Sequence, residues 1–130
     1  MNWRWIDKRV LLLLHDESLA MHGGSPGLRD AGLLDTALAR PLNRVAYAGD
    51  DPPDFAELAA AYTVELAKNH CFVDGNKRVA FLAVGLFLHL NGHKLTASQA
   101  DATVAMQGVA AGSISEAEFA AWLRDRSTRR

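Results

Sequence analysis

The sequence lacks several features that would place the chain in a specialised class of protein. It holds one cysteine in 130 residues, which excludes an intramolecular disulfide and suits a reducing cytoplasm. Its net charge of −1 gives no general attraction to nucleic acid or to an anionic membrane. The apolar stretch at residues 79–90 is shorter than the roughly 20 residues that cross a bilayer. Residues 1–5 also lack a secretory pattern, so we expect a soluble cytoplasmic protein.

Repeats, low-complexity segments and linkers are absent as well. Because 49% of the residues are apolar, the chain can bury a substantial core without disulfides. We therefore expect one domain over residues 1–130.

Apolar residues recur at helical spacing in six segments, which predicts an all-α domain of about six helices around a buried central helix at roughly residues 75–91. The first helix should span residues 7–21 with Asp7 as its N-cap, and the second should run from Asp30 to residue 40, where Pro41 ends it. Residues 42–53 lack this periodicity and are predicted to form a loop, with a short strand near residues 45–47.

The remaining helices have clearer start signals. Two prolines and Asp54 open a third helix that ends at residues 68–69. Asp74 can cap the central helix, and a fifth should span residues 98–111. Ser115 and Glu118 form a capping box for the last. The four arginines that follow residue 123 are predicted to form a solvated, frayed tail rather than a binding arm.

The chemically richest stretch is His-Cys-Phe-Val-Asp-Gly-Asn-Lys-Arg at residues 70–78, directly before the apolar part of the central helix. A helix N-terminus offers unpaired N–H groups and about half a positive charge. Gly75 lets a ligand approach the backbone closely. Asn76, Lys77 and Arg78 add hydrogen-bond donors and charge, so the stretch is suited to bind an anion.

Two further residues indicate a reaction rather than binding alone. Asp74 is acidic where an anion is expected, which makes sense if it holds Mg²⁺ beside substrate phosphates. Histidine is a common general base in proteins, and His70 could take a proton from an attacking hydroxyl. Phe72 would anchor the loop. These groups are what transfer of a phosphoryl group to a hydroxyl requires.

Each residue also has a plainer interpretation. Asp74 could be only an N-cap, and Lys77 and Arg78 could be a solvated first turn. Lys68 and His70 could simply complement the negative end of the preceding helix. Caps alone, however, do not need a histidine, an aspartate, a glycine and two cations within nine residues.

Other sites fit the sequence poorly. The chain has no Gly-x₄-Gly-Lys-Ser/Thr loop and no Gly-x-Gly-x-x-Gly after a strand. His89 and His93 are four residues apart, but residues 91–92 should break the helix between them, which disfavours zinc. Cys71 has no second base in sight and is a poor nucleophile.

Residues 70–78 resemble the signature of the Fic/Doc family, in its death-on-curing toxin branch. The similarity covers about residues 11–95 and includes the Gly-Gly-Ser-Pro-Gly-Leu-Arg-Asp stretch at residues 23–30. The resemblance implies an all-α Fic fold that acts with ATP and Mg²⁺ on a protein hydroxyl. It assigns His70 as the base, Asp74 as the metal ligand, and Gly75, Asn76 and Arg78 as phosphate ligands.

Lys77 departs from the usual Fic pattern, which has glycine at this position in enzymes that transfer AMP. The lysine would fill space that the α-phosphate needs and would add a cation for other phosphates. The death-on-curing branch shares this lysine and phosphorylates elongation factor Tu. The resemblance therefore favours transfer of the γ-phosphoryl group, with AMP transfer as the alternative.

The resemblance also implies a protein partner. Many Fic proteins inhibit themselves through Ser/Thr-x-x-x-Glu, and no Ser or Thr of this chain has Glu four residues later. This absence is typical of a toxin held by a separate antitoxin, here of the Phd type, which would fold as a helix onto an apolar groove.

Residues 43–55 correspond to the flap that positions the target in Fic proteins, although Tyr47 is expected to be a packed loop residue. A non-catalytic anion-binding module and a DNA-binding regulator are the other hypotheses; the second has little support from charge.

Overall fold

The structure, a computed structural model, describes residues 2–130 and consists mostly of helix. The helices are α1 (Lys8–His22), α2 (Ala31–Ala46), α3 (Phe55–Lys68), α4 (Asn76–Leu90), α5 (Gln99–Ala111) and α6 (Glu116–Asp125). Two short strands, β1 (His93–Leu95) and β2 (Ser127–Arg129), follow α4 and α6. The all-α prediction is confirmed. None of the helices in residues 2–130 has the length and apolar composition needed to cross a membrane.

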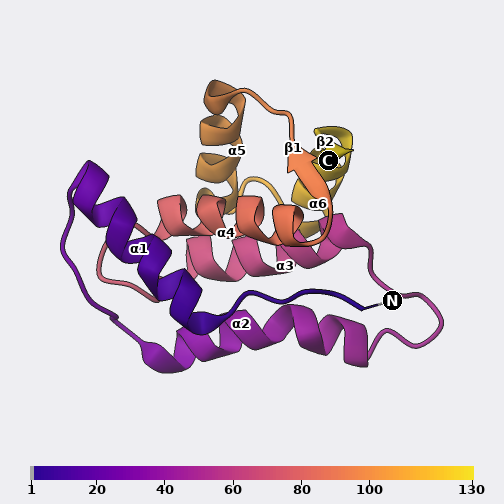
Figure 1. The fold of residues 1–130 in the computed structure, drawn as a ribbon, viewed down its shortest axis with the longest axis horizontal. Coiled ribbons are helices and arrows are strands. Elements are labelled where there is room, and N and C mark those ends of the chain that lie inside the picture. Colours follow the sequence, from indigo (N-terminus) through magenta and orange to yellow (C-terminus); the bar gives the residue numbers. More distant parts are fainter. Residues whose placement is uncertain (1) are drawn as a thin grey trace.

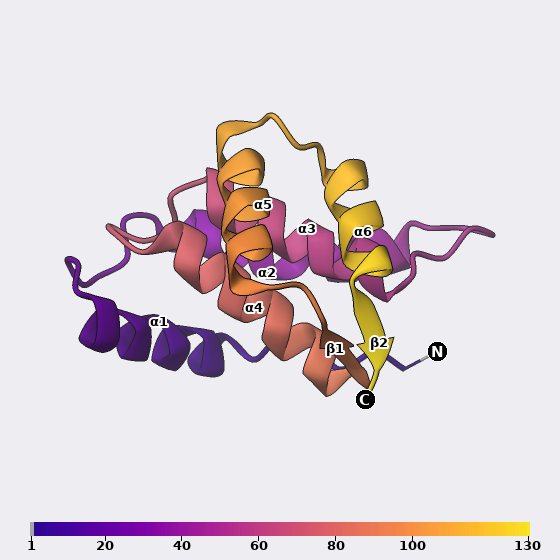
Figure 2. The same ribbon diagram turned by 90° about the horizontal axis from the view of Figure 1, so that it is seen from above.

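The core is built around the pair α3 and α4. The two helices lie side by side, with α2 on one side and α5 on the other (Figure 1). Viewed from above, α5 and α6 stand next to each other over the pair (Figure 2). Of the two central helices α3 is the more deeply buried, since it packs against α2, α4, α5 and α6. On α4 the buried side chains follow one face, and Gly85 on the opposite face is exposed, so this helix is not enclosed all round.

Most predicted helix starts are confirmed. Asp7, Asp30, Asp54, Ser98 and Ser115 each accept a hydrogen bond from an amide in the first turn of their helix. The first helix was predicted from the spacing of Ile6, Val10, Leu13, Leu14 and Met21, but of these only Ile6, which precedes α1, is buried. The buried positions are Leu11, His15 and Ser18, while Leu13 and Met21 are exposed.

The predicted end of α2 was wrong. The helix continues through Pro41 to Ala46, so residues 42–46 form neither loop nor strand. Ion pairs on both sides of the proline hold it: Arg40 and Arg44 both bind Glu116 of α6, and Arg44 also binds Glu57 at 3.0 Å. Together with the burial of Leu34, Ala37 and Pro41 in the packing of α2 on α3, these ion pairs compensate for the hydrogen bond that the proline cannot donate.

The frayed C-terminal tail was also a wrong prediction. Residues 127–129 pair with β1 in an antiparallel ribbon, with Lys94 opposite Thr128. Arg124 binds Asp54 at 2.7 Å, and the Arg130 Nε donates to the His89 carbonyl at 2.9 Å. Backbone pairing and these contacts order a segment whose composition suggested only solvation.

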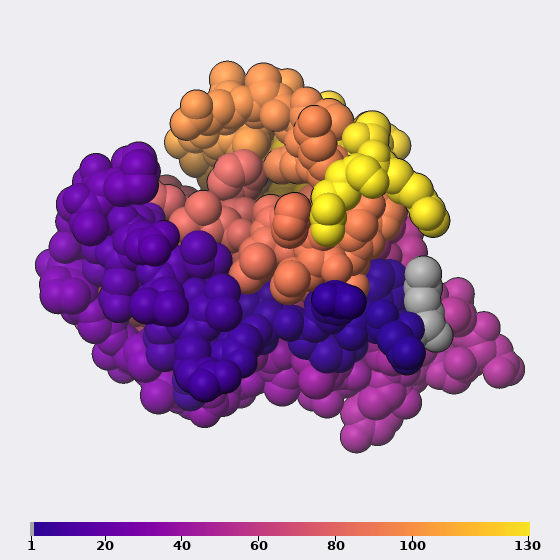
Figure 3. All heavy atoms as spheres, viewed as in Figure 1, coloured from indigo at the N-terminus to yellow at the C-terminus, as the bar shows by residue number. Residues whose placement is uncertain are grey.

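The N-terminal segment lies across the other side of the same end of α4. The Asn91 side chain accepts from the Arg4 amide at 2.9 Å and donates to the Arg4 carbonyl at 3.0 Å. Trp3 and Trp5 both stack on Phe87. In Figure 3 this indigo segment covers the boundary between α4 and the magenta helices below it. The C-terminal end of α4 is thereby fixed, and its N-terminal end carries the polar stretch.

Candidate active site

The N-terminus of α4 is open. Gly75 is the N-cap, in a left-handed conformation with φ 76° and ψ 21°, and no side chain caps the helix. The first intrahelical hydrogen bond runs from the Val79 amide to the Gly75 carbonyl at 3.0 Å. The amides of the first turn therefore point out of the helix without an intrahelical partner, which creates a place for an anion.

Asp74 does not cap the helix, contrary to the prediction. Its Oδ1 accepts from the Gly75 amide at 2.9 Å and its Oδ2 from the Ser25 amide at 3.3 Å. The loop approaches so closely that a Cβ on Gly24, which has φ 123°, would lie 2.9 Å from Asp74 Oδ2. The carboxylate is thus fixed by two loops and is still exposed to solvent.

A metal ion at Asp74 would need ligands besides protein side chains. Among residues 2–130 no three His, Cys, Asp or Glu side chains are grouped so that they could hold one. Mg²⁺ commonly binds through one or two carboxylates and completes its shell with water and substrate phosphates. The exposed carboxylate of Asp74, beside an open helix N-terminus, fits this mode of Mg²⁺ binding.

The loop before α2 and the loop before α4 are joined by backbone hydrogen bonds next to the site. The Arg29 and Asp30 amides donate to the Cys71 carbonyl at 2.8 and 3.0 Å, and the Val73 amide donates to the Gly27 carbonyl at 3.0 Å. Residues 23–30 and 70–78 both contribute to the resemblance to the Fic/Doc family, but nothing in the sequence indicates that the two segments lie next to each other. This pairing joins the start of α2 to residues 70–75, the loop between α3 and α4 that is called the motif loop below.

Phe72 anchors the loop, as expected, and is 1% exposed. The buried Asn76 side chain holds the Phe72 backbone at both ends, since its Oδ1 accepts from the amide and its Nδ2 donates to the carbonyl, each at 3.0 Å. The Asn76 amide group therefore faces inward. The backbone N–H of Asn76, which has no intrahelical partner, is the group best placed for the phosphate binding that the resemblance assigned to this residue.

Sequence reasoning missed His15 of α1. Its ring stacks on Phe72 with 3.8 Å between centroids, and its Nε2 lies 2.8 Å from the Asp74 carbonyl oxygen. It is 2% exposed. The available signal was its spacing from Leu11, which puts both residues on the buried face of α1.

His70 lies just after the end of α3 and is exposed. It has φ 49°, and no other non-glycine residue in residues 2–130 has a positive φ. A left-handed backbone is uncommon at a non-glycine residue, histidine adopts it more often than most, and such conformations cluster at functional sites. The Arg29 guanidinium donates to the His70 carbonyl at 2.6 Å and to the Asn69 carbonyl at 3.0 Å.

The two cations of the motif project into solvent. Lys77 and Arg78 are exposed and form no ion pair within the described chain, so both charges are available to a ligand. Cys71 between His70 and Phe72 is buried, and burial raises the pKa of its thiol. A protonated thiol is a poor nucleophile, as the sequence indicated.

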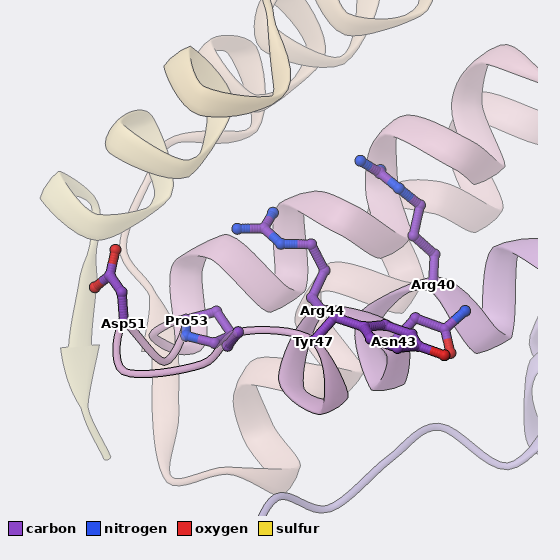
Figure 4. A pocket seen from close by; sticks show the side chains of 7 residues that line it. Arg40, Asn43, Arg44, Tyr47, Asp51 and Pro53 are labelled. Carbon is purple, nitrogen blue, oxygen red and sulfur yellow. The ribbon is translucent and has the colours of Figure 1, made fainter.

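A separate pocket is lined mostly by residues of the predicted flap, residues 43–55. It has a volume of about 460 Å³ and is lined by residues of α2 and of the loop after it, none of them from the motif. Arg40 and Arg44 extend from α2 in the same direction (Figure 4). Tyr47 at the pocket edge is 86% exposed, so the expectation of a packed tyrosine was wrong.

Comparison with known proteins gives consistent results. A family model described as the Fic/DOC family matches residues 5–88. A protein named Protein kinase doc, from Escherichia phage P1, is 39% identical over 123 residues, which cover 93% of this chain and 94% of the phage protein. A protein named Toxin Doc, from Mycolicibacterium smegmatis, is 51% identical over 75 residues, which cover 58% of this chain and 57% of that protein.

Proposed function

Because the chain belongs to the Fic/DOC family, we propose that it is the toxin of a toxin–antitoxin pair and transfers the γ-phosphoryl group of ATP to a Ser or Thr hydroxyl of a translation factor. The observation that carries the proposal is the arrangement of the motif. An exposed histidine in a left-handed conformation precedes an uncapped helix N-terminus that bears Asp74, Lys77 and Arg78. By the resemblance, the target is elongation factor Tu.

In the proposed reaction His70 acts as a general base. Its neutral imidazole takes the proton of the target hydroxyl while the hydroxyl oxygen forms a bond to the γ-phosphorus. The bond from that phosphorus to the β–γ bridging oxygen breaks, and ADP leaves with the electron pair. The histidine later releases its proton to solvent. A location in the cytoplasm would give the enzyme access to both ATP and its target.

The phosphates would lie against the first turn of α4. The backbone amides of Gly75 and Asn76 are candidates to contact them, although the Gly75 N–H already donates to Asp74. Lys77 and Arg78 would stabilise the negative charge of the transition state. Mg²⁺ held by Asp74 would supply further neutralisation of phosphate charge.

The proposed antitoxin is a Phd-like protein with a segment that folds into a helix on binding. A surface between α1 and the motif region is the proposed groove. Apart from this surface, α1 exposes two apolar side chains that a partner could bury, Leu13 at 61% and Met21 at 80%.

The test uses purified protein, elongation factor Tu and ATP labelled at either the α or the γ position. We expect only the γ label to reach the target, and we expect the His70→Ala variant to transfer less than about 1% as much, because general bases contribute about 100- to 10,000-fold. Binding of ATP to that variant should be retained. Transfer of the α label, or a fully active His70→Ala variant, would contradict the proposal.

The Lys77→Gly variant tests whether Lys77 supports transfer of the γ-phosphoryl group. If the lysine excludes the α-phosphate and stabilises the γ-phosphoryl group, the variant should lose γ transfer by about tenfold or more, because it loses a charge that acts on the transition state. The same labelled-ATP assay measures it. Arg126→Gly removes a cation outside the motif and should leave γ transfer unchanged.

A further inference from the structure

Arg29 reaches the backbone that carries His70 from a loop about 40 residues earlier in the chain. We propose that Arg29 is a positioning residue for His70: its guanidinium holds the carbonyls of Asn69 and His70 and thereby fixes the direction of the imidazole. This inference rests on the proposed function, in which His70 is the base.

The contacts of Arg29 are specific to its side chain. The Nε donates to the His70 carbonyl at 2.6 Å and Nη2 donates to the Asn69 carbonyl at 3.0 Å. A guanidinium presents such donors in one rigid plane, so two successive carbonyls are held in a defined relation. The Arg29 amide also donates to the Cys71 carbonyl at 2.8 Å. One residue therefore binds three consecutive peptide units.

The backbone of His70 requires such support. Its φ of 49° is unfavourable for an L-residue with a side chain, and such conformations persist only where the surroundings impose them. The carbonyls of Asn69 and His70 lie at the C-terminal end of α3, where backbone oxygens lack intrahelical partners and a cation is favourable. The sequence suggested Lys68 and His70 for that charge, but Arg29 makes these contacts.

Other contacts hold the rest of the loop without Arg29. Asn76 binds the Phe72 backbone, and His15 contacts Phe72 and the Asp74 carbonyl. The Arg29 side chain is exposed, so its truncation leaves no internal cavity. We therefore expect its loss to release His70 while the motif loop stays folded.

The test compares Arg29→Met and Arg29→Lys with the wild-type protein in the γ-label assay. Arg29→Met should lower kcat by about 10- to 100-fold, the cost of a small misplacement of a reacting group, and should leave KM for ATP within about twofold. Arg29→Lys retains the charge and one donor and should recover part of the rate. A wild-type kcat in Arg29→Met would overturn the inference.

A matched control separates positioning from general destabilisation. Asn91→Ala removes the bonds to Arg4 at the far end of α4 and should lower the melting temperature without affecting His70. If Asn91→Ala loses kcat to the same extent as Arg29→Met, the effect is one of stability and the inference fails.

NMR of the free protein separates this inference from the proposed function. The Cε1–H signal of His70, assigned with His70→Ala, should shift in Arg29→Met, and signals of core methyl groups should not. An unchanged His70 signal would overturn the inference. If the wild type transfers no label but the signal shifts, the proposed function fails, and the structural role of Arg29 stands.

Discussion

Asn76 illustrates, at the scale of one residue, how the side chain of a motif residue can make a structural contact that the motif does not reveal. The resemblance assigns this residue to phosphate, and the motif does lie at the N-terminus of α4. The Asn76 side chain, however, is 8% exposed and bonds to both polar groups of Phe72. Its local role is to close the loop that presents the neighbouring residues. The sequence could not distinguish these roles, because an asparagine suits both.

Asn76→Ala should therefore destabilise the protein. Loss of the side chain leaves the buried amide and carbonyl of Phe72 unpaired, which costs about 1–3 kcal/mol in the free energy of unfolding. Urea unfolding measures this change. Lys77→Ala alters the next residue, whose side chain is exposed, and should stay within about 0.5 kcal/mol of the wild type. Equal stabilities of the two variants would contradict the assignment.

At the scale of secondary-structure elements, α2 shows how tertiary contacts override a local signal. Pro41 removes one hydrogen bond from the helix and would normally end it. Glu116 of α6 binds Arg40 on one side of the proline and Arg44 on the other. A carboxylate shared by two turns therefore supports the helix where its backbone is weakest.

Glu116→Gln should loosen the second half of α2. We expect a loss of about 1 kcal/mol in stability at low salt, which shrinks in high salt because the pairs are partly exposed. Amide hydrogen exchange should become faster at residues 42–46. Asp35→Asn removes an exposed ion pair between α2 and Lys8 of α1 and should leave amide exchange at residues 42–46 unchanged.

The elements that sequence reasoning recovered are those with local signals. Capping residues and apolar spacing placed five helix starts correctly, and those signals depend only on neighbouring residues. The continuation of α2, the β1–β2 ribbon and the buried His15 depend on partners far away in the chain. The same applies to the site: the motif was visible, whereas the contact of Arg29 with His70 links residues about 40 positions apart.

At the scale of the whole molecule, both ends of the chain are tied to the end of α4 opposite the motif. Asn91 holds the N-terminal segment, and the β1–β2 ribbon holds the C-terminal one. In β1, His93 stacks on Phe55 with 3.8 Å between ring centroids. Burial, aided by the Arg129 charge and partly opposed by Asp54, lowers the pKa of His93. The histidine is thus held more readily in its neutral form.

This shift predicts a dependence of stability on pH. A histidine with a lowered pKa binds fewer protons in the folded than in the unfolded state near pH 6, so its contribution is complete above about pH 6.5 and is lost as the pH falls below it. The melting temperature should therefore decline between pH 7 and pH 5. His93→Phe keeps an aromatic ring against Phe55 and should show a smaller decline; an identical pH profile would refute the role of His93.

The proposed transfer of a phosphoryl group by His70 is tested most directly by the intact mass of elongation factor Tu. The factor would be isolated from cells that express either the wild-type chain or His70→Ala. We predict that the wild type adds the mass of one phosphoryl group and that His70→Ala adds nothing. An adduct with the mass of AMP, or a phosphoryl adduct that persists with His70→Ala, would contradict the account.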